Sequence, residues 1–220
     1  MAGGLDGVWR RTRLALEGVE VEGLSDVCWL QAGSWFGDLR TLRFGTDEGS
    51  PASEGAFSGR TRLAGPRITF LRDMDLRPGG EPDSARLVLE GDELVESGHA
   101  VVGGERLAYE ERWLRAGPAA SGRVLEGRGP ADATGAIRAR FIDVDGQALG
   151  FLDERARGGA FLASEYRWRD GAWALVRSLR GGVLAPPAGR DPAAGSWMGL
   201  AWRVRYAAGR GQTGGAGDDA

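Results

Sequence analysis

The sequence predicts an all-β protein built around a closed antiparallel barrel. Short segments with alternating apolar and polar residues follow one another from residue 7 to about residue 180, and no long stretch has helical periodicity. The 220 residues include 38 glycines and 8 tryptophans. Glycine is typical of turns and bulges, and tryptophan is enriched in half-buried strands, so composition and pattern favour the same fold class.

The first part of the chain is predicted to be an antiparallel meander, because its segments are spaced at the short intervals that hairpins need. A loop is expected over residues 45–55, which are rich in glycine, serine and acidic residues. The predicted strands cover residues 7–16, 26–31, 35–44, 56–62, 67–73, 85–90, 93–97 and 106–115.

A run of small residues with one proline interrupts the pattern at 116–122 and predicts a seam between an N-terminal half (1–116) and a C-terminal half (123–206). The residues 207–220 that follow are expected to be a disordered tail.

Two Asp-Gly pairs give the strongest local signals in the second half, since Asp-Gly favours a two-residue hairpin turn. Asp145-Gly146 separates strands predicted at 136–144 and 147–156, and Asp170-Gly171 separates those predicted at 161–169 and 172–180. Prolines after residue 181 predict a connection, and 196–206 is the last predicted strand.

Charge and cysteine content narrow the function classes. All 28 basic residues are arginine, and the net charge is −3. A basic stripe is expected in a nucleic-acid binder, so this balance argues against one. With Cys28 as the single cysteine, no internal disulfide or thiolate zinc cluster can form. The N-terminus has no secretory pattern and no segment reaches the ~20 apolar residues of a membrane span, so we expect a cytoplasmic protein that does not bind membranes.

The stretch from Val27 to Arg40, with Trp29-Leu30-Gln31 followed by Asp38-Leu39-Arg40, resembles a segment of a group of uncharacterised bacterial proteins. Three further elements match that group in order and spacing: Trp9-Arg10-Arg11, Phe57-Ser58-Gly59 and Tyr109-Glu110-Glu111-Arg112-Trp113. The group is similar to a calycin-like family whose fungal members contain two small lipocalin-like barrels. The resemblance implies a calycin-like barrel in each half, and it implies a fold more than a function, because calycins differ widely in ligand and chemistry.

Side chains alternate across a strand, so residues two apart share a face. In 106–115 this places Glu111 in a row with Tyr109 and Trp113. A carboxylate on the inner face of a barrel is costly unless it pairs with an arginine, shifts its pKa or meets a ligand. A structural ion pair is the first expectation for Glu111, and a ligand or catalytic contact is the second.

The same argument puts Asp38 and Arg40 on one face of 35–44. If that face points inward, a polar cluster forms inside a ring of aromatic side chains, as is typical of ligand sites; if it points outward, the cluster does not exist. The predicted polar residues are Gln31, Asp38, Arg40 and Glu111, and the predicted aromatic ring is Trp29, Phe36, Tyr109 and Trp113.

Other chemical signals are weak. His99, the single histidine, is expected to be exposed in a loop between two short strands, and no Gly-x-Ser-x-Gly motif accompanies it. The Asp73–Asp75 and Asp143–Asp145 pairs lack the further carboxylates of a calcium loop, so turn residues are expected. No metal and no cofactor is predicted.

Three functions remain open. The first is a binding module for a small, largely apolar molecule, oriented by Arg40 or Glu111 in a barrel cavity. The second is a cofactor-independent enzyme of secondary metabolism, an isomerase, cyclase or lyase, with Glu111 or Asp38 as acid or base. The third is a structural or interaction protein with filled barrels. A homodimer is compatible with all three.

Overall fold

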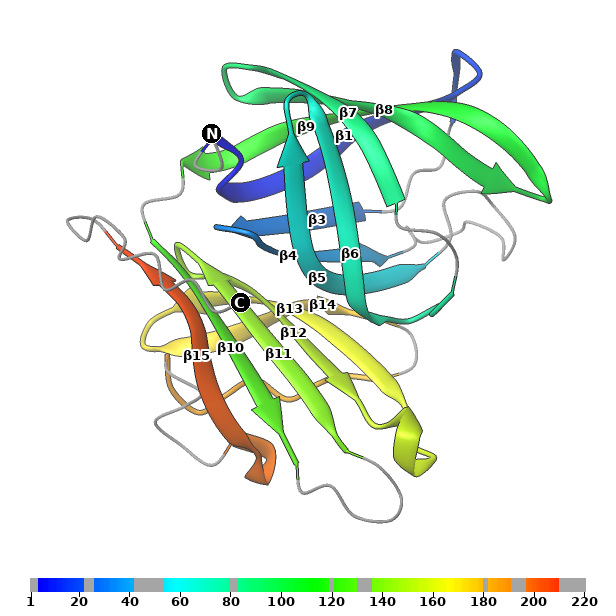
Figure 1. The fold of residues 1–220 in the computed structure, drawn as a ribbon. Coiled ribbons are helices and arrows are strands. Elements are labelled where there is room, and N and C mark those ends of the chain that lie inside the picture. The colour runs from blue at the N-terminus through cyan, green and yellow to red at the C-terminus, as the bar shows by residue number, and fades with distance from the viewer. Residues whose placement is uncertain are drawn as a thin grey trace.

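The computed structural model describes residues 4–21, 26–41, 54–79, 83–118, 121–129, 136–179, 182–190 and 197–209. The described chain forms two antiparallel sheets that pack one above the other, the first curved into a barrel (Figure 1). The predicted all-β fold with a closed antiparallel barrel is confirmed. No helix within the described ranges has the length and apolar character needed to cross a membrane.

The first sheet closes on itself, because β1 pairs with β3 along one edge and with β9 along the other. This gives eight strands around the barrel, with the two-residue β2 added at the end of β1. Closure removes the exposed strand edges of an open sheet. The strands are β1 (Gly7–Leu16), β2 (Val19–Glu20), β3 (Asp26–Ala32), β4 (Trp35–Thr41), β5 (Gly55–Ala64), β6 (Arg67–Asp75), β7 (Asp83–Glu90), β8 (Glu93–Val102) and β9 (Glu105–Pro118).

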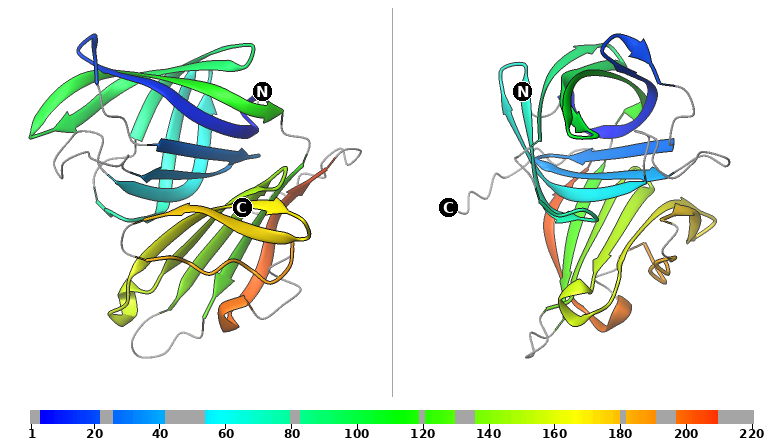
Figure 2. Two further views of the ribbon diagram at one scale, coloured as in Figure 1. Left: turned by 180° about the vertical axis from the view of Figure 1, so that it is seen from behind. Right: turned by 90° about the vertical axis from the view of Figure 1, so that its right-hand side faces the viewer.

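The second sheet has the order β14-β13-β12-β11-β10-β15. Among the described residues β14 and β15 do not pair, so this sheet is open, unlike the first, and the barrel that the resemblance implied for the second half is not closed (Figure 2). Its elements are β10 (Gly122–Arg128), β11 (Arg138–Val144), β12 (Gln147–Asp153), the short 3-10 helix η2 (Arg155–Arg157), β13 (Phe161–Arg169), β14 (Ala172–Ser178), the 3-10 helix η4 (Trp197–Gly199) and β15 (Ala201–Ala208).

Both predicted Asp-Gly hairpins are present. Asp145 has φ 51° and Gly146 has φ 80°, while Asp170 and Gly171 have φ 51° and 79°. Positive φ at both central residues is the conformation whose twist matches that of the flanking strands.

Several segment predictions need correction. The strand predicted to reach residue 156 ends at Asp153 and gives way to η2, the predicted strand 196–206 begins only at Ala201, and β15 continues through Ala208 into the predicted tail. The strand β10, Gly122–Arg128, was not predicted, because its two glycines and two arginines hide the alternation. The expected loop 45–55 lies outside the described residues except at its last two positions.

The outer face of the barrel is buried where the second sheet covers it. Outward-facing residues of β3 and β4, including Leu30 and Leu39, form one apolar cluster with Ile142 and Phe151 of the second sheet. At Gly37 a Cβ atom would lie 2.9 Å from Phe151 Cε2, closer than real Cβ contacts come, so glycine permits this approach. Strands β3 and β4 are therefore buried on both faces.

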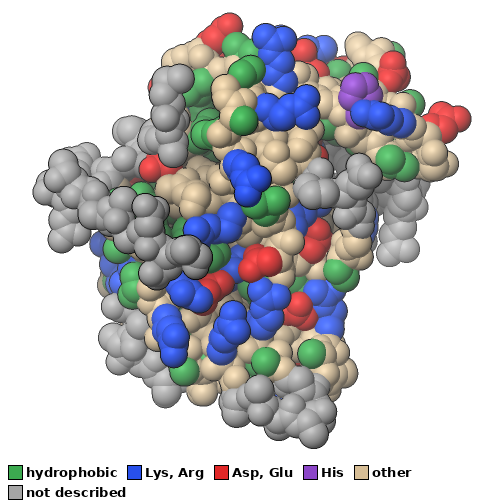
Figure 3. Space-filling model, viewed as in Figure 1, with side chains coloured by type: hydrophobic (Ala, Val, Ile, Leu, Met, Phe, Trp, Pro, Cys, Tyr) green, Lys and Arg blue, Asp and Glu red, His purple; other side chains and the backbone are tan. Residues whose placement is uncertain are grey.

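Ion pairs connect the same two sheets. Glu165 of β13 has no exposed surface and binds Arg10 of the barrel together with Arg177 of β14. Elsewhere along the junction, Arg140 of β11 binds Asp73 of β6. Figure 3 shows arginine and acidic side chains intermixed where the barrel meets the second sheet. Since a buried charge is stable only when it is paired, these contacts favour one arrangement of the two sheets.

Candidate functional site

The barrel interior contains most of the side chains that the sequence analysis singled out. Phe36, Asp38 and Arg40 of β4 alternate with Trp35 and Leu39, which contact the second sheet. The inward orientation of Asp38 and Arg40 is therefore the one that occurs. Trp29 of β3 and three residues of β9, namely Tyr109, Glu111 and Trp113, lie on the same inner side.

Four charged groups form a chain of ion pairs inside the barrel. Arg40 Nε donates to Asp38 Oδ1 over 2.9 Å, and Arg40 Nη1 lies 3.7 Å from Glu111 Oε1. Arg11 of β1 also binds Glu111, and the side chains of both are at most 5% exposed. Glu111 thus has the arginine partners that a buried carboxylate needs. These ion pairs explain its burial without a ligand.

Gln31 does not join this cluster. Its Nε2 donates to the carbonyl of Gly33 over 2.7 Å and to Thr61 Oγ1 over 2.8 Å, while its Oε1 accepts from Trp29 Nε1 over 3.2 Å. In the pairing of β3 with β4, Gln31 lies opposite Phe36, whereas Asp38 lies opposite Trp29 and Arg40 is two residues further on. The prediction that Gln31 belongs to this cluster was wrong. Alternation along a strand predicts which face a side chain shares, but it does not predict the position of that side chain along the barrel axis.

Glu96 of β8 is the buried carboxyl that the sequence analysis missed. It is 5% exposed, lies directly opposite Glu111 in the pairing of β8 with β9, and accepts a hydrogen bond from the Tyr109 hydroxyl over 2.9 Å. The sequence did contain a signal for its inward orientation. Glu96 lies two residues after the apolar Leu94, which has no exposed surface, and residues two apart on a strand share a face. Among the described residues, Glu96 forms no ion pair with an arginine.

Burial and neighbouring charges shift the pKa values in this cluster. Burial, followed by the negative charges of Glu111 and Asp83, raises the pKa of Glu96 to about 8. Burial also raises the pKa of Asp38, although Arg40 opposes that change. For Tyr109, burial and the nearby Glu96 raise the pKa of the phenol, so the hydroxyl keeps its proton as a donor.

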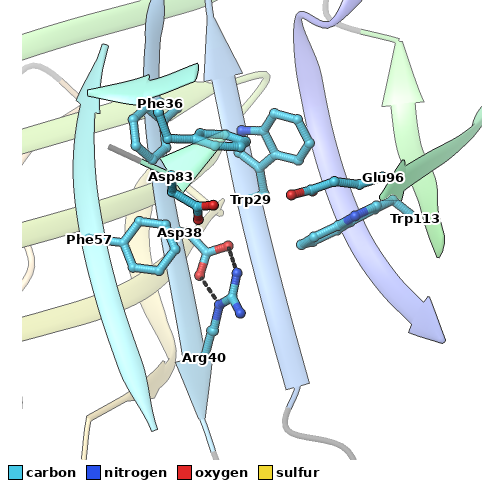
Figure 4. A pocket seen from close by; sticks show the side chains of 9 residues that line it. Trp29, Phe36, Asp38, Arg40, Phe57, Asp83, Glu96 and Trp113 are labelled. Carbon is cyan, nitrogen blue, oxygen red and sulfur yellow. Dashed lines mark hydrogen bonds and ion pairs between the residues drawn. The ribbon is translucent and has the colours of Figure 1, made fainter. Parts of the chain in front are cut away.

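A small cavity remains between these side chains (Figure 4). Its volume is about 10 Å³, which is close to the least that one water molecule occupies. Figure 4 shows the Glu96 carboxyl between the rings of Trp29 and Trp113, with Arg40 bonded to Asp38 below them. The lining residues are Trp29, Phe36, Asp38, Arg40, Phe57, Phe70, Asp83, Glu96 and Trp113.

Aromatic packing explains why so little space is left. The Trp29 ring lies 5.5 Å from that of Trp113 and 5.7 Å from that of Phe70, both in edge-to-face geometry. Small barrels are commonly filled in this way by their own side chains. The cavity lies nearest to solvent at Arg40 and Asp83, whose side chains are 28% and 31% exposed, and we call this side the open end of the barrel. A ligand larger than water must therefore move side chains there in order to enter.

A second cavity of about 170 Å³ lies at the seam between the barrel, the segment Ser121–Gly122 and the end of β15. Gln31 and Tyr206 line it, and so does Asp6, which accepts a hydrogen bond from the Gly33 amide over 2.9 Å. Burial raises the pKa of Asp6, but this carboxyl is only partly buried, unlike that of Glu96.

The other candidates have structural surroundings. His99 lies within β8 and not in a loop, because the strand continues through Gly98. The Tyr109 side chain lies across that glycine. The histidine is exposed, as expected. Asp73 binds Arg138 and Arg140, and Asp143 accepts from the Gly146 amide in the hairpin turn. Within the described residues, no group of three or more histidine, cysteine or acidic side chains is arranged to hold a metal ion.

Comparison with known proteins supports the fold and no more. No family model and no curated protein matches the chain. Among solved structures, the uncharacterised protein YLR301w of Saccharomyces cerevisiae is similar, with a TM-score of 0.68 over 91% of this chain and 98% of that protein. The two sequences are 16% identical, so the likeness concerns the fold alone.

Proposed function

We propose that the barrel is a binding module for a small, largely apolar molecule that places a polar end in the cavity beside Glu96. The observation that carries this proposal is the meeting of aromatic walls with a buried carboxyl that has no arginine partner among the described residues. Apolar walls with a few convergent polar groups, one of them with a shifted pKa, are typical of ligand sites.

The size of the cavity limits how such a ligand would bind. Because the cavity measures about 10 Å³, only one polar group of the ligand fits without rearrangement. Its apolar body would lie at the open end, against Phe57, over which Arg40 and Arg72 place their guanidinium groups at 5.1 and 3.8 Å from the ring centre. Displacing these two arginine side chains would uncover the ring.

Native mass spectrometry of the protein purified from its source tests the proposal. We expect wild type to retain a small molecule that Phe57→Trp loses, because the larger indole blocks the open end of the barrel. Val19→Trp is the matched control, since Val19 is 70% exposed on β2, away from the cavity. Equal retention by Phe57→Trp, or no bound molecule in any of the three proteins, would contradict ligand binding at this site.

A cofactor-independent enzyme is the second candidate, and the pKa of Glu96 favours it. A general acid or base works best when its pKa is near the operating pH, and that of Glu96 is about 8. We therefore expect Glu96 to be the acid or base of such an enzyme, in place of Glu111 and Asp38, which are paired with arginines. An isomerase, cyclase or lyase would lose turnover of the retained molecule in Glu96→Gln while still binding it; a pure binding module would show no turnover in wild type.

The finer sequence predictions belong to the same proposal. They are the relationship to the bacterial group with the Trp-Leu-Gln and Asp-Leu-Arg motifs, a role in secondary metabolism, and a location in the cytoplasm. The ligand-binding roles of Trp29, Phe36, Arg40 and Trp113 rest on their place in the cavity wall.

A further inference from the structure

The cavity beside Glu96 contains a hydrogen-bond donor that the protein does not use. Trp113 is 2% exposed, and its indole Nε1 has no hydrogen-bond partner within the described structure. By contrast, the indole nitrogens of Trp173, Trp197 and Trp202 each donate to a backbone carbonyl at 3.0 Å. A buried donor without an acceptor is costly, so this N–H requires an acceptor from elsewhere.

Glu96, which lines the same cavity, supplies a second donor. The Tyr109 hydroxyl donates to Glu96 Oε1, so a proton on the carboxyl group resides on Oε2. Burial and the negative charges of Glu111 and Asp83 favour this protonated form up to pH values near 8. A neutral carboxylic acid held in an apolar site can donate a hydrogen bond at neutral pH.

Both groups line the same cavity, whose volume of about 10 Å³ accommodates one oxygen atom. We propose that this cavity selects ligands with a carbonyl oxygen, which accepts hydrogen bonds from the Trp113 indole and the Glu96 carboxylic acid. The inference rests on the proposed function, because it names the ligand class for the same site. An ammonium group fits less well, since it offers no acceptor to the indole N–H.

Three probes of similar size separate the ligand classes: acetophenone carries a carbonyl, α-methylbenzylamine an ammonium group and toluene neither. The readout is the indole N–H signal of Trp113 in ¹H–¹⁵N spectra, assigned with Trp113→Phe. Acetophenone is expected to shift this signal, whereas the signal of Trp173, which already donates to Gly189, stays in place.

The pH dependence supplies the decisive comparison. If only protonated Glu96 binds the carbonyl, affinity for acetophenone falls about tenfold between pH 6.5 and pH 9, since the pKa is about 8. Glu96→Gln keeps a donor at this position and is expected to bind acetophenone with the same affinity at both pH values.

The alternative outcomes are distinct. Preferential binding of α-methylbenzylamine, with affinity that rises with pH, would overturn the carbonyl inference and leave the binding function standing. Acetophenone binding that is independent of pH in wild type would also overturn it. If no probe shifts the Trp113 signal up to its solubility limit, a water molecule alone satisfies the indole, and both the inference and the binding function fail.

Discussion

The hydroxyl of Tyr109 donates to Oε1 of Glu96 over 2.9 Å, across the pairing of β8 with β9. This contact orients a carboxyl that is 5% exposed and lies opposite a second carboxyl, Glu111. The two carboxyls have different partners: Glu111 binds Arg11, whereas Glu96 accepts from a neutral phenol. Glu111 therefore stabilises the barrel through its ion pair with Arg11, whereas the protonation of Glu96 changes near pH 8.

Glu96→Gln tests that difference through the pH dependence of stability. The pKa of Glu96 is raised from 4.5 to about 8 in the folded state, so the folded protein binds the proton more tightly than the unfolded chain. Wild type should lose stability relative to the variant by about 1.4 kcal/mol per pH unit between these two pKa values, and the difference should level off above pH 8. Chemical denaturation at several pH values measures it. Parallel profiles for wild type and variant would show that Glu96 ionises normally.

Glu111→Gln removes the carboxylate that Arg11 and Arg40 share. Because the side chains of Glu111 and Arg11 are 5% and 2% exposed, the loss should cost about 3–5 kcal/mol in the free energy of unfolding. The matched control is Glu110→Gln, whose side chain is 40% exposed next to Arg112 and should contribute about 0–1 kcal/mol. Equal effects of the two variants would place Glu111 outside the barrel interior.

Glu165→Gln tests the connection between the barrel and the second sheet. Burial opposes ionisation of Glu165, but Arg10 and Arg177 lower its pKa overall. Its stabilising effect is therefore present above the unfolded pKa near 4.5 and is lost as the pH falls through the lower folded value. At neutral pH the variant should be less stable by about 3–5 kcal/mol, with a smaller difference in acid, as urea denaturation would show. A difference that grows in acid would contradict this assignment.

Gly37→Ala tests the close packing of the two sheets. The added methyl group would lie 2.9 Å from Phe151 and 3.1 Å from Ile142, so we expect a loss of about 1–3 kcal/mol from overpacking. Phe151→Leu removes the ring edge that the methyl would meet. The double variant should therefore lose less than the sum of the single losses, and simple additivity would argue against direct contact between these residues.

Alternation in the sequence predicted much of the site. It placed Tyr109, Glu111 and Trp113 on one face of a strand and grouped Asp38 with Arg40, and the structure has both arrangements. The Asp-Gly pairs likewise predicted the hairpins at Asp145 and Asp170, because positive φ at both turn residues is a local requirement.

Which face points inward was decided by tertiary structure. The second sheet buries the outer side of β3 and β4, so Trp35 and Leu39 are buried as Phe36 is, and hydrophobicity cannot distinguish the two faces. The position of Glu96 opposite Glu111 depends on the register of β8 with β9, and Gln31 was misassigned because parity gives no level along the barrel axis. The sequence by itself determined strands, turns and the sharing of faces, which are local properties of the backbone. Barrel closure and the packing of the second sheet decided which charges meet, because these depend on contacts between residues far apart in the chain.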